Sequence, residues 1–213
     1  MGLRIRLLAP ALVAALCGSC AQMDMTRSGF LSSYDQLEEA PDREVRFVPD
    51  EVDYFEASAI DWTRYDTVLV EPVEYHQVGD RKRGPNREQR ARLASEFTEI
   101  LRRELSEEHE LVDEPGPGTV LVRAAVTDAD PSNIWINWLG LILVVPPDMG
   151  GISGELELLD AATGERLVAM TATREGTPFL LIECFFTWGH AHHGMKKWAR
   201  SLARTIETPA AGE

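Results

Sequence analysis

The feature that most constrains the fold is a β-hairpin pattern over residues 152–174. In residues 152–158 apolar and polar side chains alternate, which is typical of a strand with one buried face. Residues 160–164 (DAATG) then predict a turn in which Gly164 can adopt a positive φ. A second strand follows over residues 167–173, so the pattern predicts a long antiparallel strand pair.

Two amphipathic helices are predicted on either side of this hairpin in the sequence. The first begins after Asn86, with Gln89 in the position that completes a capping box. Its apolar stripe consists of Leu93, Phe97, Ile100, Leu101 and Leu105. The stripe of the second, C-terminal helix consists of Ala191, Met195, Trp198, Ala199, Leu202 and Ile206. Both stripes have helical spacing and require a buried surface to pack against.

The order of elements predicts the fold class. A buried strand at residues 67–70 precedes the first helix, and an alternating strand at residues 120–126 follows it. The order strand, helix, strands, hairpin, helix predicts an α+β fold: a two-layer sandwich with a mostly antiparallel sheet and both helices on one face.

The segments before this core are less regular. Residues 30–37 predict one or two helical turns with Phe30, Tyr34 and Leu37 on one face, and residues 50–57 are acidic and irregular. We therefore expect a tether and N-terminal wrap over residues 20–60, a single α+β domain over residues 61–208, and a frayed tail at residues 209–213.

The N-terminus has the layout of a secretory signal. Arg4 and Arg6 precede an apolar run at residues 7–16. This run is too short for a transmembrane helix, because spanning a bilayer takes about 20 apolar residues. Residues 1–19 are therefore predicted to be a signal peptide.

The end of the signal predicts a lipoprotein. Cleavage before Cys20 places the small residues Gly18 and Ser19 in front of the acceptor cysteine, whereas cleavage before Cys17 would place bulky Leu16 there. An ordinary secretory signal with two incidental cysteines is the alternative. We predict acylation of Cys20. The residue after it is not Asp, which favours a lipid-anchored location on the outer membrane of a Gram-negative bacterium, facing the periplasm.

Charge excludes one class of partner. Removing residues 1–19 takes away two of 21 basic residues and no acidic ones, which leaves 19 basic against 35 acidic residues and a net charge of −16. Such a surface repels nucleic-acid phosphates and anionic lipid headgroups, so the acyl group on Cys20 must hold the chain on the membrane. After processing, Cys184 is the only free cysteine, so no intramolecular disulfide is expected.

Three blocks of sequence resemble one known family. These are residues 28–34 (SGFLSSY), 61–70 (DWTRYDTVLV) and 154–166 (GELELLDAATGER). They are similar to the bacterial lipoproteins with domain of unknown function 3313 (DUF3313), as is the terminal helix around Trp198. The resemblance implies an envelope lipoprotein of unassigned role and carries over no catalytic or ligand residue. The chain departs from the family pattern in the acidic stretch between the first two blocks and in residues 179–188.

Residues 128–133 (DADPSN) resemble the opening of a calcium-binding loop. Such a loop needs Gly at its sixth position and a bidentate Glu at its twelfth, where this chain has Asn133 and Leu139. A polar strand end explains the residues more simply.

Histidines and one cysteine form a second candidate metal cluster. His190, His192, His193 and Cys184 are ligand types that suit zinc or copper. However, His190 and His192 would point apart on a helix, and a fourth ligand is unspecified, so a polar first helical turn is the preferred interpretation. Apolar neighbours around Cys184 are typical of an unreactive thiol. Because no nucleotide loop, nucleophile elbow or zinc-protease motif occurs either, we expect no cofactor and no enzymatic activity.

Two apolar runs, residues 134–145 and 179–188, flank the hairpin and do not alternate. An antiparallel hairpin brings its two ends together, so the runs are expected to lie side by side. They either enlarge the core or leave an exposed surface with Trp135, Trp138 and Trp188 as anchors.

Two functions fit these patterns: a non-enzymatic interaction or assembly module with an envelope protein partner, or a binder of apolar ligands or lipids with the runs as walls. A metal or thiol enzyme would rest only on the histidines and Cys184, and diverging side chains would rule it out.

Overall fold

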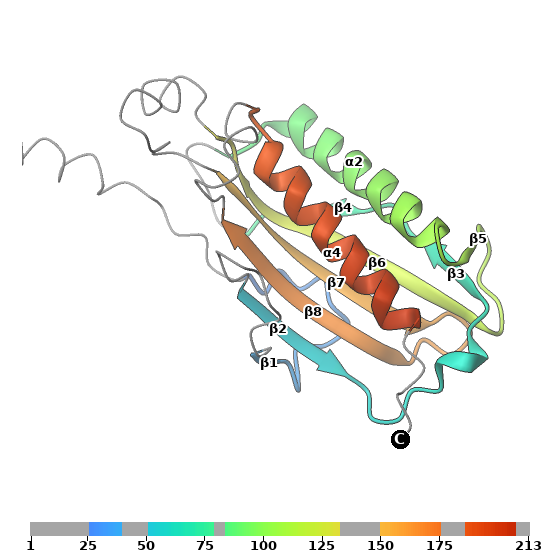
Figure 1. The fold of residues 1–213 in the computed structure, drawn as a ribbon. Coiled ribbons are helices and arrows are strands. Elements are labelled where there is room, and N and C mark those ends of the chain that lie inside the picture. Colours follow the sequence, from blue (N-terminus) through green and yellow to red (C-terminus); the bar gives the residue numbers. More distant parts are fainter. Residues whose placement is uncertain (1–25, 40–50, 79–83, 133–149, 176–185, 208–213) are drawn as a thin grey trace, which may run out of the picture.

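The computed structural model describes residues 26–39, 51–78, 84–132, 150–175 and 186–207. Within these ranges the chain forms one eight-stranded sheet with two long helices across one face (Figure 1). The helices are α2 (Arg87–Ser106) and α4 (Gly189–Glu207), and a 3-10 turn, η1, covers Trp62–Arg64. The strands are β1 (Glu38–Glu39), β2 (Glu51–Glu56), β3 (Thr67–Val70), β4 (Glu74–Tyr75), β5 (Glu110–Val112), β6 (Thr119–Asp130), β7 (Gly151–Asp160) and β8 (Arg166–Glu175).

The sheet has the order β1-β2-β8-β7-β6-β3-β5, and β4 pairs with β6. Its long central pairs, β6 with β7 and β7 with β8, are antiparallel, as are β2 with β8 and β1 with β2. Parallel pairs are confined to one side, where β3 pairs with β5 and β6, and β4 with β6. The predicted α+β sandwich, with both helices on one face, is confirmed.

The helices form as their sequence patterns predict. The Asn86 side chain accepts a hydrogen bond from the Gln89 backbone at 3.0 Å, and the Gln89 side chain accepts one from the Asn86 backbone at 2.8 Å, which completes the capping box. Phe97 and Trp198 are both buried where the helices meet, with ring centroids 6.3 Å apart. Trp198 also lies over β7 at Gly154, where a Cβ would approach its ring to 3.0 Å.

The predicted hairpin turn is also confirmed. Gly164 has a φ of 73°, and its N–H donates to the carbonyl of Asp160 at 2.8 Å. The Asp160 side chain accepts from the backbone of Ala162 and Thr163, and the bond from Thr163 is the main reason that its pKa lies below the usual value. Tyr65 donates to the same carboxylate at 3.0 Å, and burial together with this bond raises the pKa of Tyr65 to about 12.

Two local predictions were wrong. Residues 30–37 form no helix but lie extended with bends and one turn, because side chains bind their backbone N–H groups in place of helical carbonyls. Ser32 donates to Glu157 of the sheet, and Phe30 and Asp35 donate to the hydroxyls of Ser28 and Ser33. Residues 51–56 are not irregular but form β2, which pairs with β8 along its whole length. Val52 and Tyr54 pack on the main core, and the acidic residues at both ends of β2 are exposed, since β2 lies next to the two-residue edge strand β1.

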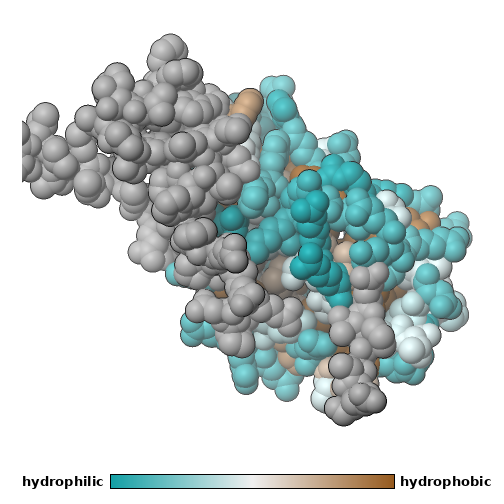
Figure 2. Space-filling model, in the orientation of Figure 1, coloured by the Kyte–Doolittle hydropathy of each residue, from teal (hydrophilic) through white to brown (hydrophobic). Residues whose placement is uncertain are grey.

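The surface over the helices is largely hydrophilic (Figure 2). Within the described ranges, no helix is both long enough and apolar enough to cross a membrane.

The two ends of the sheet are named here by their residues. We call the end where β6 finishes at Asp130 and β7 begins at Gly151 the Asp130 end. We call the opposite end, with the turn at residues 161–164, the hairpin end. Both α2 and α4 begin near the Asp130 end (Figure 1).

Candidate functional site

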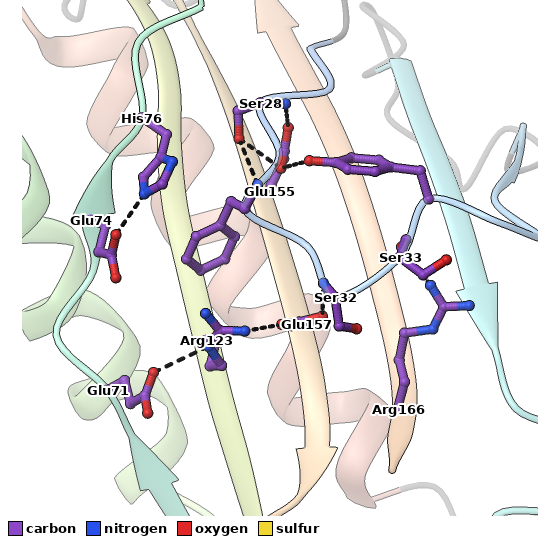
Figure 3. A network of polar contacts seen from close by, with 12 residues as sticks. Ser28, Ser32, Ser33, Glu71, Glu74, His76, Arg123, Glu155, Glu157 and Arg166 are labelled. Atoms are coloured by element: carbon purple, nitrogen blue, oxygen red, sulfur yellow. Dashed lines mark hydrogen bonds and ion pairs between the residues drawn. The ribbon is translucent and has the colours of Figure 1, made fainter. Parts of the chain in front are cut away.

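A strap of chain lies across the sheet face that the helices leave uncovered. The strap consists of residues 26–37, and it rests on β6, β7 and β8 (Figure 3). Its apolar residues Phe30 and Leu31 are buried against Ala125 and Ala169. The strap lacks strand and helix hydrogen bonds over most of its length, and the sheet supplies acceptors for two of its backbone N–H groups, those of Ser28 and Ser32.

Glu155 is the first of these acceptors. This β7 side chain is fully buried and projects from the strand toward the strap. It accepts hydrogen bonds from the Ser28 backbone at 2.6 Å, the Ser28 hydroxyl at 2.9 Å and the Tyr34 hydroxyl at 2.5 Å. Burial, and then the bond to Glu155, raises the pKa of Tyr34.

The strap needs a glycine between these two donors. Gly29 has a φ of 86°, which residues with a side chain rarely adopt. Its N–H donates to the Tyr34 hydroxyl at 2.7 Å, so one tight bend lets Ser28 and Tyr34 reach the same carboxylate.

Glu157 is the second acceptor, two residues further along β7. It is also fully buried, accepts from the Ser32 backbone at 2.9 Å, and forms an ion pair with Arg123 of β6. Arg123 also donates to Glu71 at 3.2 Å, and its guanidinium lies 4.9 Å from the centre of the Phe30 ring. The buried negative charge is therefore balanced by a cation that also covers the apolar part of the strap.

Arg166 fixes the far end of the strap. Its guanidinium donates to the carbonyls of Ser33 at 2.5 Å and Asp35 at 3.0 Å, and it lies 4.0 Å over the ring of Phe55. The strap is thus held at three points along its length, by Glu155, Glu157 and Arg166.

The histidines of the last helix point in different directions. His192 reaches across to α2, where its Nε2 lies 2.6 Å from Glu96, whereas His190 is buried near Arg174 of β8. Burial and the nearby positive charge of Arg174 lower the pKa of His190 to about 4. The polar first turn of α4 is therefore divided between a buried histidine, His190, and a partly exposed one, His192. In the described part of the chain, no group of three His, Cys, Asp or Glu side chains is arranged to hold a metal ion.

The other candidate residues are placed as follows. Asp128 lies in β6 and accepts from the backbone of Ala129 at 2.9 Å, so the calcium-like segment begins inside a strand. Trp188 is half-buried and packs against the main core. Cys20, Trp135, Trp138, Asn133, Leu139 and Cys184 lie outside the described residues.

Sequence reasoning missed the residues that hold the strap. Glu155 and Glu157 were assigned to the polar face of an alternating strand, which usually faces solvent. The signal that pointed to them was the similarity of residues 28–34 and 154–166 to blocks of one family, and the structure shows these blocks in direct contact.

Comparisons with known proteins give a family and distant structural neighbours. The family described as protein of unknown function (DUF3313) matches residues 26–202. The "Uncharacterized lipoprotein YdcL" of Escherichia coli K12 is 25% identical over 187 residues, which cover 78% of this chain and 82% of that protein. The relative of the same name from strain O157:H7 matches equally.

Among solved structures, the PelC dodecamer from Paraburkholderia phytofirmans matches with 14% identity and a TM-score of 0.42, over 77% of this chain and 99% of that one. The hypothetical protein CT253 from Chlamydia trachomatis matches with 13% identity and a TM-score of 0.37, over 66% of this chain and 95% of that one.

Proposed function

Since this chain belongs to the DUF3313 family of proteins of unknown function, and its relative in Escherichia coli is a lipoprotein, we propose that it is an envelope lipoprotein that serves as a non-enzymatic interaction or assembly module. In this proposal the signal peptide ends at residue 19, Cys20 carries the lipid, and the folded domain faces the periplasm from the outer membrane.

The observation that carries the proposal is the strap. The segment that leads from Cys20 toward the domain is fastened to the sheet by two buried carboxylates and one arginine. Such fastening couples the position of the domain to that of its anchor. It suits a module that presents a surface at a fixed place near the membrane.

The chemistry of the strap supports a structural role for its charges. Glu155 and Glu157 are fully buried beneath the strap, and their oxygens already accept hydrogen bonds from it. A substrate could reach these carboxylates only after the strap had left the sheet. His192 contacts Glu96 of α2 while His190 is buried near Arg174, and this separation of the two histidines supports the proposal of a non-enzymatic module.

The described residues on either side of the two apolar runs, which we call their stems, support a partner surface at the Asp130 end. The Ser132 backbone, two residues before the first run, donates to the carbonyl of Thr187, near the end of the second run, at 3.0 Å. Gly151 and Glu175, at the inner stems, are direct partners across β7 and β8. The described residues that flank the two runs therefore adjoin one another, and by their sequence Trp135 and Trp138 are the candidate anchors for a partner.

A binder of apolar ligands or lipids is the second candidate, because the same adjoining stems would let the runs form the walls of one pocket. Crosslinking in intact cells separates the two. We expect one protein adduct of defined mass that requires Cys20 and is lost in a Trp135→Ala/Trp138→Ala variant. Glu99→Gln, a change of an exposed residue on α2, is the matched control.

The outcomes of this experiment are distinct. A stoichiometric apolar ligand found by native mass spectrometry, without any protein adduct, would favour the ligand binder. Finding neither an adduct nor a ligand would contradict both candidates.

A further inference from the structure

The strap reaches the sheet at one particular end. Thr26, its first described residue, hydrogen-bonds Thr127 of β6, and Ser28 follows at Glu155 of β7. Thr127 lies three residues before Asp130, which is about 10 Å along a strand. From there the strap runs toward the hairpin end, where Arg166 holds it. The described strap therefore begins near the Asp130 end.

The distance between Cys20 and this arrival point is short. Six residue steps separate Cys20 from Thr26, and even a fully extended chain spans only about 20 Å over that length. Thr127 lies seven residues from Val120, which pairs with Asp160 at the hairpin end, so these two positions are about 24 Å apart along the strand. A membrane at the hairpin end would require the tether to be fully extended back along the sheet, whereas a membrane at the Asp130 end lies well within its length.

Exposed apolar side chains gather at the same end. In the described ranges, the two large hydrophobic side chains that remain exposed are Phe186 at 61% and Val78 at 38%. Val78 donates its N–H to the carbonyl of Thr127, beside the arriving strap. Phe186 precedes Thr187, whose carbonyl accepts from Ser132 just beyond the end of β6. These two side chains come from separate parts of the sequence and meet the solvent at the Asp130 end.

We propose that the Asp130 end of the sheet faces the lipid surface and that Phe186 and Val78 contact it. This inference rests on the proposed acylation of Cys20. It adds an orientation: α2 and α4 begin near the membrane, and the hairpin turn at residues 161–164 points away from it. The acidic surface of the mature chain disfavours close contact elsewhere with anionic headgroups, so the contact depends on apolar side chains and the anchor.

Photocrosslinking of the mature lipoprotein in vesicles of phosphatidylethanolamine and phosphatidylglycerol tests this orientation. Benzoylphenylalanine is placed at position 186 in one variant and at position 162 in a second. Ala162 is the matched control, because it is exposed in the turn at the hairpin end. We expect lipid adducts at position 186 to exceed those at position 162 at least about tenfold. The same probe at position 78 should also label lipid.

Equal labelling at positions 186 and 162, or stronger labelling at 162, would overturn the proposed orientation. The intact mass of the same samples shows whether Cys20 carries its acyl chains. If it does and the labelling is equal, only the orientation fails. If it does not, the proposed lipoprotein function fails and the orientation fails with it.

Discussion

Removing the carboxylate of Glu155 should release the strap. In a Glu155→Ala variant, three donors lose their acceptor: the Ser28 backbone, the Ser28 hydroxyl and the Tyr34 hydroxyl. A hydrogen bond to a charged group contributes about 1.5–3 kcal/mol to stability, so the three together could cost more than 4 kcal/mol if the strap stayed in place. A strap that detaches avoids this cost because its donors then reach water.

The loss of stability in Glu155→Ala is therefore limited to the free energy that docking of the strap contributes to the fold. Burial of Phe30 and Leu31 stabilises docking by about 1.5–3 kcal/mol for each side chain, and ordering the backbone opposes it. We expect Glu155→Ala to lower the free energy of unfolding by about 3 kcal/mol. Glu155→Gln should cost about 1 kcal/mol, since an amide can still accept from the Ser28 backbone and donate to the two hydroxyls.

Urea unfolding of the mature chain carrying Cys20→Ala measures both values. With a slope of about 2 kcal/mol per M, Glu155→Ala should lower the midpoint by about 1.5 M. Limited proteolysis should cut residues 26–37 faster in this variant than in the parent. The matched control, Glu99→Gln on the exposed side of α2, should leave both readouts unchanged. An unchanged midpoint together with unchanged proteolysis in Glu155→Ala would refute the claim that the buried carboxylate holds the strap.

Four further outcomes follow from the sequence and the packing. Cys20→Ala should abolish acylation and membrane retention, and a lipid-free mature chain that begins at another residue would contradict the prediction. Phe97→Ala and Trp198→Ala should each cost about 3–5 kcal/mol in urea unfolding, because both side chains are buried where the helices meet; midpoints equal to the parent would refute this. The unfolded chain protonates His190 near pH 6.5, but the folded chain protonates it only near pH 4. Stability of up to about 3 kcal/mol should therefore be lost as the pH falls from 6.5 toward 4. A His190→Gln variant should lack this part of the pH dependence. Elemental analysis of untagged protein should find no stoichiometric metal, and zinc or copper that disappears in His190→Ala/His193→Ala would overturn that expectation.

The fold could be predicted because each of its main elements carries a periodic pattern of apolar residues in its own sequence. Alternation in residues 152–158 and helical spacing around Phe97 and Trp198 each identify an apolar face, and such faces must meet. The capping box at Asn86 and the glycine at 164 are local features that need no distant partner. Prediction of these elements therefore depended only on neighbours in the sequence.

The strap and β2 could not be predicted in the same way, because their conformation depends on distant partners. Residues 30–37 carry helix-like spacing, but the bonds from Ser32 to Glu157 and from Arg166 to Ser33 span more than a hundred residues. The acidic residues of β2 are not typical of a strand. The strand forms because it pairs with β8, whose edge would otherwise be unpaired. Tertiary hydrogen bonds overrode local propensity in both segments.

The contacts of the strap explain why three separate blocks of sequence resemble the family together. A segment that crosses a sheet without joining it buries N–H groups that need acceptors, and a strand offers its own carbonyls only to neighbouring strands. Glu155 and Glu157 solve this by placing carboxylates on the uncovered face, at alternate positions of β7.

A shift of β7 by one residue would turn both side chains into the apolar core beneath the helices, so the strap also fixes the register of the central strand. The second block is tied to the third in a similar way, through the bond from Tyr65 to Asp160 at the hairpin end. The strap can dock only after β6, β7 and β8 have paired, because its three holding points come from β7 and β8 and its buried apolar residues rest on β6 and β8. The part of the chain nearest the anchor is therefore expected to order last.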